Sequence, residues 1–140
     1  MGSAGEERVT ILLDTHVWWW WITGERRLST AQQRRLAKIT PQNPALVSEI
    51  SLWEVATLFS LGRLELDVPL REWLEGASAE PLVRRCGISP AVAAEVAALP
   101  DSFHRDPADR ILVATARVQG ATLLTQDDRI IRSGLVATVG

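Results

Sequence analysis

The chain has 140 residues, of which 46% are hydrophobic and 23% are charged. This composition suits one globular domain with a buried core, and it excludes wholesale disorder. The formal net charge of -2 gives no general attraction to nucleic acid, so a polyanion would need local basic patches or bound cations. The single cysteine, Cys86, excludes a disulfide within the chain and fits a reducing cytoplasm. No segment approaches the roughly 18 apolar residues of a membrane span.

The first eight residues, MGSAGEER, are small and polar, and we expect a disordered or tag-derived extension before a domain at residues 9–139. Along that domain, short apolar segments of strand length alternate with helical segments. In chain order we expect a strand at 9–13, helices at 15–22 and 30–39, a strand at 45–48, helices at 51–61 and 70–75, a strand at 81–83, helices at 90–98 and 107–118, a strand at 121–124, a helical turn at 128–132 and a last strand at 135–139. This alternation predicts a single α/β domain whose central parallel sheet of four to five strands is flanked by helices.

Four acidic residues occupy positions where such a sheet collects ligands. Asp14 directly follows the first predicted strand, and Asp127 lies three positions after the strand at 121–124. Glu54 and Asp109 lie in the first turns of two predicted helices. Ligands of open parallel sheets bind beyond the carboxyl ends of the strands, so we expect these four acids to meet at one edge.

Each of these acids also has a structural explanation as part of a helix cap. The possible caps are Asp14, the pair Ser51 and Glu54 with capping-box spacing, Asp106 with Asp109 behind Pro107, and Asp127 with its neighbour Asp128.

The surroundings of Glu54 favour a different role. Its face of the predicted helix carries Leu58 and Leu61, and a carboxylate there needs a cation, hydrogen bonds or a raised pKa. Four carboxylates at one edge also repel each other. A hard divalent cation, Mg²⁺ or Mn²⁺, would balance them, orient a water molecule and neutralise charge on a phosphate.

Four segments in this order resemble the motifs of the PIN domain, and more narrowly those of VapC-like toxins of bacterial toxin–antitoxin systems. They are residues 12–16 (LLDTH), 51–56 (SLWEVA), 104–110 (HRDPADR) and 124–127 (LTQD). The resemblance covers about residues 9–139. It implies a cytoplasmic, homodimeric, Mg²⁺- or Mn²⁺-dependent endoribonuclease that hydrolyses RNA phosphodiester bonds and binds a small VapB-like antitoxin.

The same resemblance implies roles for individual residues. The family's four acids match Asp14, Glu54, Asp109 and Asp127, which are therefore the implied catalytic and metal-binding residues. The flanking polar residues are implied as supporting or water-positioning groups, and one of them, Asp106, is foremost a cap. These flanking residues are Thr15, Asp106 and Thr125.

The run Trp18 to Trp21 departs from the family pattern. Four consecutive residues cover every side of a helix. We therefore expect two of these side chains in the core and the others on an interaction surface. That surface would serve a second copy or an antitoxin before it served RNA bases.

No RNA-binding residue is assigned from the sequence. Phosphate contacts are to be sought first at two groups of arginines, although such charges can equally be solvated faces. The groups are Arg26, Arg27, Arg34 and Arg35, and the pair Arg84 and Arg85.

Two other functions compete with the nuclease. One is a catalytically degenerate PIN domain that binds RNA or protein. The other is a phosphoacceptor signalling domain, which would need a lysine at the site, whereas the sole lysine, Lys38, lies in a surface-like helix.

Overall fold

A computed structural model of the chain describes residues 9–140, and the expected N-terminal extension at 1–8 lies outside the described residues. Five strands form one sheet in the order β3-β2-β1-β4-β5, and every neighbouring pair is parallel. The strands are β1 (Ile11–Leu13), β2 (Ala45–Ser48), β3 (Val83–Cys86), β4 (Thr122–Leu124) and β5 (Thr138–Val139). The prediction of an α/β domain with a parallel sheet of four to five strands is confirmed.

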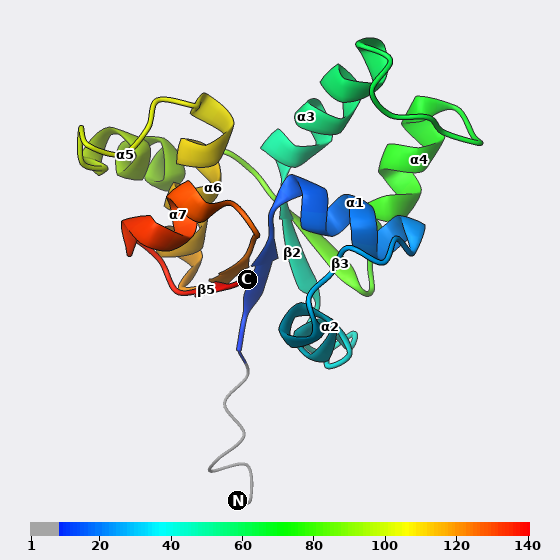
Figure 1. Cartoon of the computed structure of the whole chain (residues 1–140), viewed down its shortest axis with the longest axis horizontal. Helices are drawn as coiled ribbons and strands as arrows, with labels where there is room; N and C mark the ends of the chain where they lie inside the picture. Colours follow the sequence, from blue (N-terminus) through cyan, green and yellow to red (C-terminus); the bar gives the residue numbers. More distant parts are fainter. Residues whose placement is uncertain (1–8) are drawn as a thin grey trace, which may run out of the picture.

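Seven helices cover the two faces of the sheet in the described part of the chain (Figure 1). Four lie on one face: α1 (Thr15–Thr23), α2 (Thr30–Leu36), α3 (Glu49–Ser60) and α4 (Leu70–Ala77). The other three are α5 (Pro90–Ala98), α6 (Pro107–Gln119) and α7 (Asp128–Ser133). None of the helices within residues 9–140 has the length and apolar character needed to cross a membrane.

The central strands are apolar throughout because both of their faces are buried. In β1, Ile11 and Leu13 enter the hydrophobic cluster beneath α1–α4, whereas Leu12 enters the cluster beneath α6 and α7. In β2, Val47 and Leu46 divide between the two clusters in the same way. Strands buried on both faces carry continuous rather than alternating apolar runs, which is how the sequence revealed them.

The third strand differs from its prediction at 81–83, because it runs from Val83 to Cys86. Only these two end residues are buried, while Arg84 and Arg85 between them are exposed. β3 pairs with β2 alone and lies at the edge of the sheet. An edge strand can carry charge on a solvated face, so its charged centre concealed it from a search for apolar runs.

The strand order reverses direction at β1. The chain proceeds from β1 to β2 and β3 on one side, and it places β4 and β5 on the other. Leu13 of β1 is level with Leu124 of β4 in the parallel register. Helices leave such neighbouring strands in different directions, which opens a crevice beyond their carboxyl ends.

The tryptophan run in α1 is held mainly by the first core cluster. Trp18 is fully buried, and its Nε1 donates a hydrogen bond to the Ala77 carbonyl over 2.9 Å. Trp19, Trp20 and Trp21 are half-buried and pack against the same cluster. The ring of Trp73 in α4 lies 5.2 Å from Trp18 and 5.0 Å from Trp19, so α4 covers a side of α1 that the sheet leaves open.

Trp18→Phe should destabilise the fold more than Trp19→Phe. The first change replaces a buried indole by a smaller ring and leaves the Ala77 carbonyl without its donor, and the lost hydrogen bond costs about 1–3 kcal/mol. The second change affects a half-buried ring that donates no side-chain hydrogen bond in the described structure. Urea denaturation followed by circular dichroism measures both free energies of unfolding. Equal losses for the two variants would contradict the assigned role of Trp18.

Candidate active site

A pocket of about 480 Å³ lies beyond the carboxyl ends of β1 and β4. We call it the acid pocket. Its lining includes all four acids singled out in the sequence, together with the flanking acid, namely Asp14, Glu54, Asp106, Asp109 and Asp127. The structure therefore brings together side chains separated by up to 113 positions in the chain, as the predicted sheet edge requires.

Asp14 is placed by the sheet and held by a threonine. Its backbone N–H donates to the Leu124 carbonyl over 3.0 Å, which joins the ends of β1 and β4. Asp14 occupies the N-cap position of α1, but its side chain makes no cap hydrogen bond to the helix. Thr125 Oγ1 instead donates to Asp14 Oδ2 over 2.6 Å and accepts from the Asp127 N–H over 3.1 Å. Burial raises the pKa of Asp14, and the Thr125 hydrogen bond offsets only part of that effect.

Glu54 does not belong to a capping box. Helix α3 begins at Glu49, and Ser48 is its cap, with a hydroxyl that accepts from the Ile50 N–H over 3.2 Å. Glu54 therefore lies in the second turn, not the first. Of the two leucines expected on its face, Leu58 is half-buried, whereas Leu61 lies beyond the end of the helix and is 60% exposed.

A chain of hydroxyls holds Glu54 in the acid pocket. Thr15 Oγ1 donates to Glu54 Oε1, and the buried Ser51 Oγ lies 2.8 Å from the same Thr15 oxygen. Because the one hydroxyl proton of Thr15 is directed to Glu54, the Ser51 hydroxyl donates to Thr15. Burial, together with the nearby charges of Asp14 and Asp109, raises the pKa of Glu54 to about 7 against the opposing effect of the Thr15 hydrogen bond. Glu54 thus has both the hydrogen bond and the raised pKa expected from its sequence.

Asp109 is positioned by the loop before α6. Asp106 is the N-cap of this helix and accepts from the Asp109 N–H over 3.1 Å, as predicted for a cap. His104 Nε2 lies 2.7 Å from Asp109 Oδ2. The buried Arg110 fixes this loop, because Nη1 donates to the carbonyls of Phe103 and His104 over 3.1 and 3.3 Å. Burial raises the pKa of Asp109, and the contact with His104 opposes this.

Asp127 differs from the other three acids because it accepts hydrogen bonds from an arginine. It accepts from the backbone N–H of Arg129 over 2.8 Å and from Arg129 Nη2 over 3.3 Å. Burial would raise the pKa of Asp127, but these contacts outweigh burial and lower it. Arg129 Nη2 also lies 3.7 Å from Asp109 Oδ2. The neighbouring Asp128 is exposed and does not line the pocket, which leaves Asp127 as the acid of this segment.

Sequence reasoning missed two supporting residues, Ser51 and Arg129. The sequence predicts Ser51 as a helix cap, whereas the structure places its hydroxyl 2.8 Å from Thr15 Oγ1, where it supports that threonine. Arg129 lies two positions after Asp127, a spacing that could have indicated a cation at the site. Of the arginines grouped in the sequence, Arg27 lines the acid pocket.

The donor set of the acid pocket fits a hard divalent cation. Within residues 9–140, no group of three or more His, Cys, Asp or Glu side chains is preassembled to hold a metal ion. Mg²⁺ does not need such a cage, since it keeps several waters and takes only one or two carboxylates directly. Burial and like charges raise the pKa of Asp14, Glu54 and Asp109 although Arg27 and Arg129 line the same pocket, so a further positive charge would favour the ionised carboxylates.

Comparisons with known proteins agree with the fold. The family model of the PIN domain matches residues 11–134. The chain is 41% identical over 121 residues to Ribonuclease VapC22 of Mycobacterium tuberculosis, covering 86% of this chain and 89% of that protein. Its fold is similar to the crystal structure of VapBC2 from Rickettsia felis bound to a promoter DNA fragment, with a TM-score of 0.70, 14% identity and coverage of 94% and 98%. It is also similar to a toxin–antitoxin complex from Klebsiella pneumoniae, with a TM-score of 0.65, 21% identity and coverage of 94% and 97%. The chain belongs to the PIN domain family.

Proposed function

We propose that this protein is a metal-dependent endoribonuclease and the toxin of a VapBC-type pair. The observation that carries the proposal is the acid pocket, where four carboxylates from four segments of the chain line one space at the reversal of strand order. The relative with 41% identity is named a ribonuclease, which supports RNA as the substrate.

Asp14, Glu54, Asp109 and Asp127 would hold Mg²⁺ or Mn²⁺ in this pocket. The bound ion would lower the pKa of a water molecule and offset negative charge on the scissile phosphate. Thr125, Thr15 and His104 keep three of the carboxylates in place through hydrogen bonds. This support matters because a misplaced ligand weakens metal binding and activity.

The four acids do not share one protonation behaviour. Glu54, with a pKa of about 7, exchanges a proton near neutral pH, whereas the lowered pKa of Asp127 keeps that carboxylate ionised. Asp127 can therefore hold a cation under conditions in which Glu54 is partly protonated. Glu54 is the carboxylate suited to accepting a proton near neutrality.

The proposed partners are a VapB-like antitoxin and a second copy of this chain, in the cytoplasm. Two of the similar solved structures are complexes of toxins with antitoxins. Trp53 and Ile88 are 60% and 48% exposed, and both line an apolar hollow of about 540 Å³ beside the acid pocket. Exposed apolar surface of this kind marks a protein interface. The single buried thiol of Cys86 suits a reducing compartment.

Asp14→Asn and Asp109→Asn should abolish RNA cleavage in Mg²⁺ or Mn²⁺ without unfolding the protein. Loss of a proposed ligand should exceed the approximately 10–100-fold loss typical of a supporting group, which is the range expected for Thr125→Val. Relief of carboxylate repulsion should leave the melting temperature equal or higher. The assay is cleavage of defined tRNA and rRNA fragments with and without EDTA.

Asp128→Asn is the matched control, because it makes the same chemical change at an exposed position outside the acid pocket. It should cleave at the wild-type rate. Cleavage that persists in EDTA would refute metal dependence. Binding of RNA by the wild type without cleavage would instead favour the degenerate binding module.

The metal-free protein should lose stability as the pH rises from about 5.5 to 8. The pKa of Glu54 is about 7 in the folded state against 4.5 as the ordinary value, so between these limits the folded state binds more protons than the unfolded state. The stabilisation is present at low pH and disappears as the pH rises through the folded pKa. The raised pKa values of Asp14 and Asp109 act in the same direction.

Melting temperatures measured in EDTA across this pH range test the effect, with Glu54→Gln as the comparison. The variant should show a flatter pH profile between about pH 6 and 8, since it removes the group that titrates there. Added Mg²⁺ should stabilise the wild type more at pH 8 than at pH 6, because the ligands must be deprotonated. Identical profiles for the wild type and the variant would remove Glu54 as the titrating group.

A further inference from the structure

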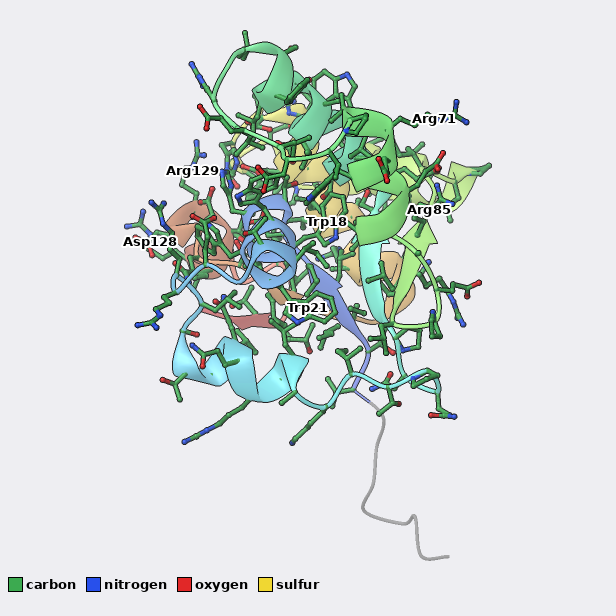
Figure 2. The ribbon with its side chains drawn as sticks, turned by 90° about the vertical axis from the view of Figure 1, so that its right-hand side faces the viewer. Trp18, Trp21, Arg71, Arg85, Asp128 and Arg129 are labelled. Atoms are coloured by element: carbon green, nitrogen blue, oxygen red, sulfur yellow. The ribbon has the colours of Figure 1, made fainter. Side chains whose placement is uncertain are left out.

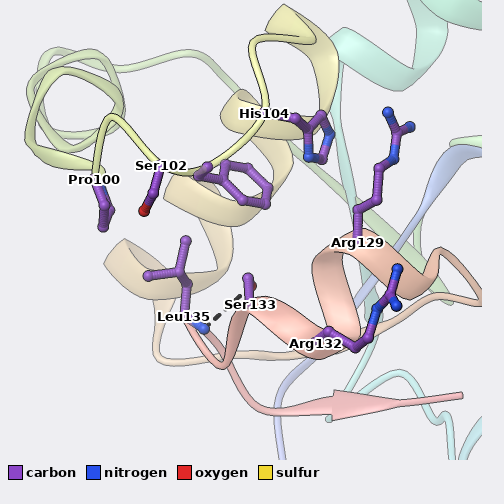
Figure 3. A pocket seen from close by; sticks show the side chains of 8 residues that line it. Pro100, Ser102, His104, Arg129, Arg132, Ser133 and Leu135 are labelled. Atoms are coloured by element: carbon purple, nitrogen blue, oxygen red, sulfur yellow. Dashed lines mark hydrogen bonds between the residues drawn. The ribbon is translucent and has the colours of Figure 1, made fainter.

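A second pocket, of about 370 Å³, lies between α7 and the loop that carries His104 (Figure 3). We call it the α7 pocket. Arg129 and Arg132 of α7 line it from one side, while Ser102 and His104 line it from the loop. The lining of the α7 pocket contains none of the four proposed metal-binding acids. It shares one residue, Arg129, with the lining of the acid pocket.

The charge of the α7 pocket is opposite to that of the acid pocket. No Asp or Glu belongs to its lining, whereas two arginines do. Arg132 is exposed and donates through Nε to the Asp128 carbonyl over 3.3 Å. In the part of the chain that the structure describes, its guanidinium forms no salt bridge, so its outer nitrogens can receive an anion.

The two pockets share a wall made of two side chains. Arg129 lines both pockets and lies 3.3 Å from Asp127 and 3.7 Å from Asp109. His104 lines the α7 pocket while its Nε2 contacts Asp109 Oδ2. An anion bound in the α7 pocket would therefore lie directly beside the proposed metal site.

We propose that the α7 pocket binds a backbone phosphate of the RNA, next to the phosphate that is cleaved. This proposal rests on the ribonuclease function proposed above. The chain has a net charge of -2 and an acidic reaction site, so a polyanion needs positive charge close to that site. A guanidinium presents planar, paired donors that match phosphate oxygens. Arg132 contacts the phosphate, and Arg129 directs the strand across the shared wall toward the acids.

The lining of the α7 pocket contains none of the arginines that are grouped in the sequence, although Arg27 lines the neighbouring acid pocket. Arg85 belongs to β3 at one edge of the sheet, while α7 lies between β4 and β5 at the other edge. Figure 2 shows Arg85 and Arg129 on opposite sides of the molecule in that view. A strand that crosses the acid pocket and reaches Arg129 leads away from Arg85. The two positions therefore give a clean comparison.

The test is the salt dependence of binding of a short single-stranded RNA to the full chain in EDTA, where cleavage cannot occur. Arg132→Gln should lower the affinity and reduce the slope of log K against log salt concentration by about 0.7, the value for one phosphate contact on a single strand. The loss should be the same for oligo-U and oligo-A, because a phosphate contact carries no base information. Arg132→Lys should restore most of the slope by replacing the point charge.

Arg85→Gln is the control, since it removes the same charge from an exposed position. It should leave the slope unchanged, and all variants should melt at the wild-type temperature. The proposal is overturned if Arg132→Gln binds like the wild type, or if Arg85→Gln causes an equal loss. Cleavage of the same RNA by the wild type in Mg²⁺ is scored separately. A failed nuclease and a failed phosphate site thus give different results.

Discussion

The acid pocket holds several carboxylates close together in a partly buried space. Burial and mutual repulsion both disfavour their ionised forms. Burial is the largest influence on Asp14, Glu54 and Asp109, and it raises the pKa of each. Hydrogen bonds from Thr125, Thr15 and His104 oppose the rise without cancelling it. The fold thus fixes the positions of the three groups and leaves a demand for positive charge. The cation proposed for this pocket would supply that charge, so an arrangement of carboxylates that destabilises the metal-free protein would be stabilised by the ion that it binds.

The parallel sheet makes this arrangement possible. Each strand delivers its following residue to the same edge, so Asp14 after β1 and Thr125 after β4 become neighbours although 111 positions separate them. The two hydrophobic clusters then fix the helices that carry Glu54 and Asp109 on opposite faces of the sheet. Buried hydroxyls such as Ser51 connect one element to the next across this junction. The geometry of the site therefore depends on the packing of the core, because a shift of α3 against α1 would break the Thr15–Glu54 hydrogen bond.

The sequence could predict the sheet and the four acids because apolar strands with acids at their carboxyl ends leave a local pattern. It placed the start of α3 at Ser51 instead of Ser48, since both serines suit a cap. Both are fully buried, and only their hydrogen bonds distinguish them: Ser48 accepts from the Ile50 N–H, whereas the Ser51 hydroxyl lies 2.8 Å from Thr15 Oγ1. The edge strand β3 was misplaced because its exposed Arg84 and Arg85 interrupt the apolar signal. Arg129 belongs to no hydrophobic or charge pattern that marks it in the sequence. Its proximity to Asp109, 20 positions away, arises only when the chain folds.

Arg129 also explains why the four carboxylates are not equivalent. The charges that act on Glu54 are those of other acids, and its pKa rises to about 7. Asp127 receives both a backbone and a side-chain hydrogen bond from Arg129, and its pKa falls. One guanidinium at the boundary of the acid pocket therefore makes the pKa values of the acids differ across the pocket.

Arg129 also lines the basic α7 pocket, so a phosphate bound there would contact the same residue that lowers the pKa of Asp127. Engagement of Arg129 by a phosphate would weaken its hold on Asp127 and Asp109 and free negative charge for a cation, so substrate binding and metal binding should favour each other.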